Sequence, residues 1–299
     1  MATDHFGNRG KGAMMANTLD IAASWDTAAA GWNQHGLLIH AWLREATHAM
    51  LEGARIGLGA HVLDVAAGAG DQTLDIARRV GHTGWVLATD ISPGILALAQ
   101  KNAEAAGLTQ VSTRTADAQL LGLAGADFDA VLCRLGLMFC HSPLAALRGL
   151  RAALKPQGRL AALVFGRPEN NPCLAITLAT AREHAGMAGV TPTKLHSAFE
   201  PGTLMSLGKP GLIQELAQTA GFVDVTVRYV SAPLHAPSAA HYVDFLRSSA
   251  SPVIDMLAPL SSSAQQHAWS DMTKRLDVFG AASGWSGPNE LLLCVAVAP

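Results

Sequence analysis

The strongest constraint on the fold is an alternation of short apolar runs with longer amphipathic stretches between residues 61 and 165. The apolar runs predict strands at 61–65, 85–89, 111–114, 128–133 and 159–165. Strands that alternate with helices of this length are typical of a parallel sheet covered on both faces. The runs also lack polar alternation, which indicates burial on both sides. We therefore expect a doubly wound α/β fold.

The alternation stops after residue 166 and returns twice. A helix at 212–220 and a strand at 222–230 resume it, and a strand at 291–298 closes the chain. We therefore expect an α/β core with a largely helical cap. The predicted units are a helical lid at 1–52, core segments at 53–166, 211–234 and 285–299, and cap inserts at 167–210 and 235–284.

Composition narrows the possible partners. The 21 basic and 23 acidic side chains give a formal charge of -2, without the basic stripe that a nucleic-acid partner requires. The longest apolar runs are far shorter than the ~20 residues of a membrane-spanning helix, and the N-terminus lacks a secretory pattern. The four cysteines show no metal-ligand spacing. We expect a cytoplasmic protein with reduced thiols and no metal.

A run of small residues follows the first predicted strand. It reads Asp64-Val65-Ala66-Ala67-Gly68-Ala69-Gly70, and Asp90 ends the second strand about 20 residues later. Small residues between a strand and a helix let a ligand approach the backbone, and the acid is placed to bind ribose hydroxyls. The third glycine of a dinucleotide fingerprint is replaced by Thr73, which disfavours an NAD site.

Five segments in order resemble the class I S-adenosylmethionine (SAM)-dependent methyltransferases. They are 62–70, with Ala66 in place of the first glycine of the family motif, 88–92, 115–118, 128–134 and 154–160. Within that family the likeness is to the ubiquinone/menaquinone-biosynthesis type of small-molecule methyltransferase. The resemblance implies a Rossmann-like sheet of seven mostly parallel strands, with an antiparallel last strand, and SAM as cofactor.

The resemblance also implies cofactor contacts. Asp64 would meet the ammonium of SAM, directly or through water, Asp90 the ribose, and Asp117 the adenine amino group. The other expected contacts are Ala66, Gly68, Gly70, Ile91, Ala118, Cys133, Arg134 and Leu135. Capping of the next helix or a loop hydrogen bond is the alternative for Asp64 and Asp90. A purely structural role is the alternative for Asp117, and an ordinary ion pair is the alternative for Arg134.

The acceptor side is less defined by sequence. His141 and His35 are the candidate bases, because a base is needed only where the acceptor must lose a proton; His196 and His235 are weaker candidates. Trp25, Trp32, Met138 and Phe139 are candidate pocket residues, with core packing as the alternative. We expect methyl transfer to an O or C atom of a small aromatic, quinone-like or lipophilic acceptor, by a protein that also forms homodimers.

Other functions remain open at the sequence level. A nucleic-acid or protein methyltransferase would need a basic or extended acceptor groove. A SAM-binding module without turnover would have the same glycine loop. An NAD-dependent oxidoreductase is also compatible with this loop. An arsenite-type enzyme would need Cys133, Cys140 and Cys173 to converge.

Overall fold

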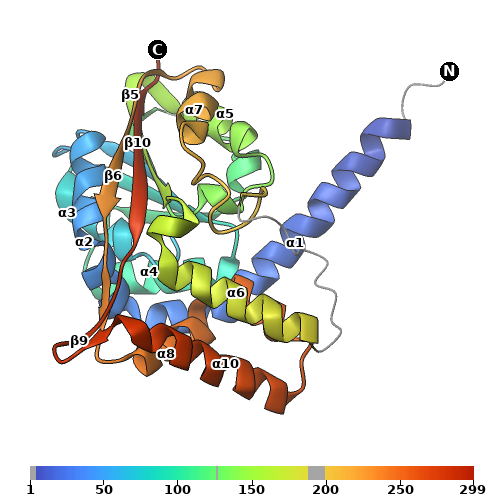
Figure 1. The fold of residues 1–299 in the computed structure, drawn as a ribbon. Helices are drawn as coiled ribbons and strands as arrows, with labels where there is room; N and C mark the ends of the chain where they lie inside the picture. The colour runs from blue at the N-terminus through green and yellow to red at the C-terminus, as the bar shows by residue number, and fades with distance from the viewer. Residues whose placement is uncertain (1–4, 126, 188–198) are drawn as a thin grey trace.

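A computed structural model describes residues 5–125, 127–187 and 199–299. Its centre is a seven-stranded sheet in the order β3-β2-β1-β4-β5-β10-β6 (Figure 1). These strands span Val111–Thr115, Trp85–Asp90, His61–Val65, Phe128–Arg134, Leu154–Phe165, Glu290–Val297 and Val223–Ser231. The first five are parallel, and β10 is antiparallel to both of its neighbours. The predicted Rossmann-like fold with an antiparallel last strand is confirmed.

Helices cover both faces of the sheet, as expected for parallel strands. One face packs against α2 (Gly36–Gly53), α3 (Asp71–Val80) and α4 (Pro93–Ala105), and the other against α5 (Pro143–Ala153) and α7 (Leu212–Thr219). Figure 1 shows α2 and α3 on the side opposite α5 and α7. Apolar side chains of the central strands, such as Leu63 and Val131, are completely buried between these layers.

The cap is a layer of helices at one end of the sheet, near the lower edge of Figure 1. Its helices α6 (Pro172–Met187), α8 (Ala239–Ser249), α9 (Ser251–Leu257) and α10 (Ser262–Leu276) pack on one another. A small sheet of β7 (Leu234–Ala236), β9 (Gly284–Gly287) and β8 (Gly280–Ala281) accompanies them. These strands were not predicted, because they are two to four residues long.

The N-terminal helical region is two helices, α1 (His5–Gln34) and α2, which meet at His35. Helix α1 contacts α4 of the core and α8 and α9 of the cap, and thus bridges the two parts. Gly31 makes the contact with α8 possible, because a Cβ there would lie 1.9 Å from the carbonyl oxygen of Ser248.

Strand β5 differs from the sequence expectation of a separate turn at 155–158. Helix α5 ends at Ala153, and β5 already begins at Leu154, which pairs with Phe128. The pairing then shifts to Ala130 with Arg159, so residues 155–158 form an irregularity within the strand. Gln157 takes a left-handed φ of 66° there, and its N–H donates to Ala298.

Short 3-10 turns complete the chain. They are η1 (Ala118–Leu120), η2 (Leu137–Phe139), η3 (Pro168–Asn170) and η4 (Asp277–Phe279). The first two follow β3 and β4 on the side where the parallel strands end. They therefore contribute to the edge where α/β proteins bind ligands.

Candidate active site

A cavity of about 650 Å³ lies at the carboxyl edge of the parallel strands. Its core side is formed by residues that follow β1, β2, β3 and β4. Helices α1, α2 and α8 supply the opposite wall. Both the lid and the cap therefore enclose the position where a doubly wound sheet binds its ligand.

The loop after β1 is shaped by left-handed backbone. Gly68 and Gly70 have φ values of 58° and 91°. A Cβ on Gly70 would lie 3.0 Å from Ala99 of α4, so this glycine permits the close packing of loop and helix. Gly68 instead meets only Ile95, at 3.9 Å, and lines the cavity. Its backbone is therefore open to a ligand.

Ala66 also takes a left-handed conformation, with φ of 56°, where the family motif has glycine. Its methyl group occupies the space beside Gly136, where a Cβ would lie 2.4 Å from the Ala66 Cβ. The absence of a side chain at Gly136 therefore accommodates the extra methyl at Ala66. Leu135, the residue before Gly136, has a φ of 57°, so both sides of this contact hold strained backbone.

Asp90 is buried at the end of β2, with 8% of its surface exposed, and lines the cavity. Its two oxygens accept hydrogen bonds from the N–H groups of Gly68 and Ser92, each at 3.0 Å. Burial raises the pKa of this carboxyl, and the two N–H donors oppose that effect. The N–H of Ile91 also donates to this carboxyl. The carboxylate thus holds the glycine loop, and since a carboxylate has about four acceptor positions, one remains for a ligand hydroxyl.

The segments after β2 and β3 bring the residues expected to contact adenine to the cavity. Ile91, Asp117 and Ala118 all line it. Asp117 also caps η1, because its Oδ1 accepts from the N–H of Gln119 at 2.8 Å. The capping role and a ligand contact are compatible, since a carboxylate has several acceptor sites.

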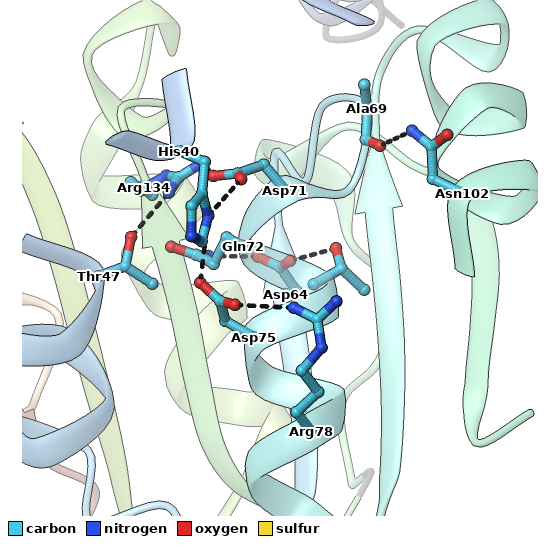
Figure 2. Close-up of polar contacts among 11 residues, drawn as sticks. His40, Thr47, Asp64, Ala69, Asp71, Gln72, Asp75, Arg78, Asn102 and Arg134 are labelled. Carbon is cyan, nitrogen blue, oxygen red and sulfur yellow. Dashed lines mark hydrogen bonds and ion pairs between the residues drawn. The ribbon is translucent and has the colours of Figure 1, made fainter. Parts of the chain in front are cut away.

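A charged network forms one corner of the cavity (Figure 2). The Arg134 guanidinium donates to Asp71 Oδ2 at 2.8 Å and to Thr47 Oγ1 at 2.7 Å. His40 Nδ1 lies 2.9 Å from Asp71 Oδ1 and 3.7 Å from Asp75 Oδ2. The network joins α2, α3 and the end of β4, and His40, Asp71 and Arg134 all line the cavity.

Asp64 is fully buried beneath this corner and does not line the cavity. It accepts from Gln72 Nε2 and Thr73 Oγ1, both at 2.6 Å, and burial raises its pKa to about 6. Asp64 therefore has no surface on the cavity, and its expected role toward the ammonium, directly or through water, stays a prediction. Gln72, which does line the cavity, has a buried Oε1 with no hydrogen-bond partner among the described residues.

Four further candidates lie off the cavity wall. Gly70 packs on Ala99, and Cys133 is completely buried with a pKa raised by burial. His141 is exposed near Gly202, and His35 packs edge-on against Phe245 at 5.3 Å. Because neither histidine lines the cavity, the structure does not support their assignment as bases. The exposed His235 also lies off this wall, and His196 is outside the described residues.

The remaining wall is apolar and rich in aromatic rings. Trp25, Trp32, Met138 and Phe139 all line the cavity as expected. Trp25 meets Phe139 edge-on at 5.1 Å between ring centroids, and Trp32 meets Phe245 of α8 at 6.1 Å. The rings thus both pack together and line the cavity, and their role as acceptor-pocket residues stays a prediction.

Hydrogen bonds fix the lid to the core. Asp26 accepts from the Gly94 N–H at 2.8 Å and from the Ser92 hydroxyl at the start of α4. Asn102 donates both to Asn33 of α1, at 2.8 Å, and to the carbonyl oxygen of Ala69 in the glycine loop, at 2.9 Å. The lid is therefore coupled to the loop that shapes the site.

Sequence reasoning missed several wall residues. His40, Gln72, Phe245 and Asn289 line the cavity but belong to no motif that was recognised. Asp71 directly follows Gly70, so the motif at 62–70 could have predicted that it lies at the site. His40 had no comparable signal, because only the packing of α2 against α3 brings it to the site.

Comparisons with known proteins agree with this geometry. A methyltransferase-domain family model matches residues 62–158. The ubiquinone/menaquinone biosynthesis C-methyltransferase UbiE of Cellvibrio japonicus (strain Ueda107) is 33% identical over 40% of this chain and 49% of its own length. The UbiE protein of Pseudoalteromonas translucida (strain TAC 125) is 30% identical over 56% of this chain and 67% of its own length.

Among solved structures, the YcgJ protein of Bacillus subtilis superimposes with a TM-score of 0.55 at 17% identity, covering 85% of this chain and 98% of that one. That likeness concerns the fold. The chain spans about half the length of several curated relatives it matches. The chain belongs to the class I SAM-dependent methyltransferases, and the branch it resembles is the ubiquinone/menaquinone biosynthesis type.

The residues present fit the family's cofactor, SAM. Gly68 leaves an open approach to the backbone, and the orphan Oε1 of Gln72 is a buried acceptor beside Asp71 that matches an ammonium donor. Asp90 remains available to ribose hydroxyls. None of the helices described is long and apolar enough to cross a membrane.

Proposed function

We propose that this protein transfers a methyl group from SAM to an O or C atom of a small aromatic, quinone-like or otherwise lipophilic acceptor. The observation that carries the proposal is the division of one cavity into two chemical halves. Charged and polar groups gather near the glycine loop, whereas aromatic and aliphatic side chains of α1, α6 and α8 line the rest. The UbiE relatives, named for C-methylation in quinone biosynthesis, support such an acceptor.

The polar half would hold the cofactor through groups from several elements. Asp90 would accept from the ribose, while Ile91 and Ala118 would contact the adenine ring. At the amino-acid end, Asp71 and the Gln72 Oε1 would accept from the ammonium. Asp64 would act indirectly, because its bond to Gln72 Nε2 orients the Gln72 amide so that Oε1 remains free.

His40 and Arg134 would complete this amino-acid subsite. Arg134 is only 9% exposed, so its charge acts in a poorly solvated place. The side chain of His40 is 40% exposed, and its contacts with Asp71 and Asp75 use Nδ1. The ammonium of the amino-acid end of SAM would thus meet acidic partners, and its carboxylate would meet basic ones. Both charges of the cofactor's amino-acid group would be matched.

Bound SAM supplies a methyl group already activated on a sulfonium. The protein's own residues must therefore orient an acceptor and exclude water, and alignment of this kind contributes about 7–11 kcal/mol to a barrier. Trp25, Trp32 and Phe245 would align a flat acceptor and shield it. Burial raises the pKa of Cys140 to about 12, so this thiol on the wall would remain protonated.

Methyl transfer from labelled SAM to a panel of phenols, hydroquinones and aliphatic amines tests the proposal. We expect label in the phenolic or hydroquinone products and formation of S-adenosylhomocysteine (SAH). Transfer confined to nucleic acid or protein substrates, or SAM binding with no turnover across the panel, would contradict it.

A further inference from the structure

The apolar half of the cavity contains three polar side chains near the cap: Tyr242, Ser249 and Asn289. Tyr242 is hydrogen-bonded to Thr177, and the Ser249 hydroxyl donates to the carbonyl oxygen of Phe245. These two groups are satisfied within the protein. Asn289 differs from both.

Asn289 directly precedes β10 and is 5% exposed. Its Nδ2 donates to the carbonyl oxygen of Gly287 at 3.2 Å. Its Oδ1 is buried and has no hydrogen-bond partner among the residues that the structure describes. A buried acceptor of this kind lowers stability unless a donor from a ligand or water reaches it.

The surroundings hold Asn289 in this orientation. The backbone carbonyl oxygen of Asn289 accepts from the Ala232 N–H at 2.9 Å. The N–H of the next residue, Glu290, donates to Asn171 Oδ1 at 3.0 Å. A flip of the amide would turn Oδ1 toward the Gly287 carbonyl oxygen, and two acceptors would then face each other. The amide is therefore arranged in advance to accept rather than donate.

The position of Asn289 places it on the acceptor side of the cavity. Strand β10 pairs with β5 so that Leu291 lies opposite Phe165, the last residue of β5. Phe165 lines the cavity together with Leu174 and Leu234. The charged wall residues belong instead to the cofactor half, at α2, α3 and the ends of β2 to β4.

We propose that Asn289 is a specificity-determining residue that accepts a hydrogen bond from a hydroxyl group on the ring of the acceptor. This inference rests on the proposed function, because it assumes that an acceptor enters the apolar half. Asn289 lines the cavity, so an acceptor bound in the apolar half would come to lie beside this amide. An acceptor without a donor leaves the amide oxygen unpaired and binds more weakly.

Two matched probes separate the hydrogen bond from apolar burial. We would titrate the SAH-saturated protein with 2-naphthol and with its methyl ether, which has the same ring system without the O–H donor. The wild-type protein is expected to bind 2-naphthol at least tenfold more tightly than the ether. Asn289→Leu is expected to remove this preference without changing the affinity for the ether or for SAH by more than twofold.

Two other variants complete the design. Asn170→Leu removes an amide that donates to Glu290 outside the cavity wall, and it should leave both probe affinities unchanged. Asn289→Ala also removes the amide oxygen and adds no apolar bulk, so it should lose the preference for 2-naphthol; it covers the case in which Asn289→Leu fails to fold.

The outcomes distinguish this inference from the proposed function. Absence of SAH binding to the wild-type protein would contradict the proposed function itself. With SAH bound, three results would each overturn the role of Asn289. The first is equal affinity of the wild-type protein for both probes. The second is an equal loss of affinity for both probes in Asn289→Leu, and the third is that the wild-type protein binds neither probe.

Discussion

The contact between Ala66 and Gly136 shows how one residue of a motif can change when its neighbour permits it. A left-handed φ costs an alanine about 1 kcal/mol relative to glycine, and the bare backbone of Gly136 receives its methyl group. The substitution therefore alters the loop only slightly. The two positions must be treated as a pair.

Gly136→Ala tests this pairing. Its Cβ would lie 2.4 Å from that of Ala66 and 3.1 Å from Cys133 Sγ, so we expect a loss of about 1–3 kcal/mol in the free energy of unfolding. Adding Ala66→Gly should restore most of that loss. Urea denaturation of the two single variants and the double variant measures the coupling, and strictly additive effects would contradict the contact.

Asp90 is the single residue on which the cofactor assignment depends most. Asp90→Ala removes an acceptor for ribose hydroxyls and also releases the Gly68 N–H that holds the loop. Charge-assisted hydrogen bonds contribute roughly 1.5–3 kcal/mol each, so SAM affinity should fall at least tenfold. Calorimetry on a folded variant checks this, and parental affinity would show that the ribose lies elsewhere.

At the scale of elements, the site is assembled by helix α2 as much as by the sheet. This helix brings both Thr47 and His40 to the network of Asp71 and Arg134. The lid helix α1 is tied to the same loop through Asn33 and Asn102. Cofactor binding and lid position should therefore be coupled.

His40→Ala examines the contribution of α2 to the amino-acid end of the cofactor. We expect the affinity for SAH to fall at least tenfold while that for 5′-methylthioadenosine, which lacks the amino-acid group, is unchanged. His48→Ala, on the same helix but with its side chain 65% exposed, is the matched control. A parallel loss for both ligands would indicate a structural role for His40 instead.

The contrast between Asp90 and His40 explains what sequence could and could not predict. The strand, loop and acid at 61–90 are adjacent in sequence, so local spacing determines their arrangement. His40 and Asn289 reach the cavity only through packing between α2 and α3 and between β10 and β5, and no local pattern reports such contacts. Sequence also left open whether Asp64 would meet the ligand directly or through water, because spacing does not show that Gln72 and Thr73 donate to its oxygens.

At the scale of the whole molecule, burial of Asp64 should make stability depend on pH. Its pKa rises from 3.8 to about 6 on burial, so the folded state binds the proton more tightly than the unfolded state. The stability from this group is complete below pH 3.8 and is lost as the pH rises through 6, by about 3 kcal/mol in all.

Chemical denaturation of the cofactor-free protein at pH 5 and pH 7.5 measures this effect. The free energy of unfolding of the wild type should fall between these values relative to that of Asp64→Asn, which does not titrate there. If the two proteins show the same pH dependence, the buried carboxyl is not the source.

The overall arrangement is a cavity shared by three parts of the chain: the sheet edge, the N-terminal helices and the cap. The sheet edge supplies the glycine loop and the acids that we assign to the cofactor. The lid and cap supply most of the aromatic wall, and we expect them to determine which acceptor is used. This division lets acceptor specificity change without disturbing the cofactor half.

Calorimetric titration of the purified protein with SAM, SAH and NAD shows whether this cavity binds SAM. We expect SAM and SAH to bind with micromolar affinity and NAD to produce no heat. Binding of NAD, or the absence of binding by both SAM and SAH, would contradict it.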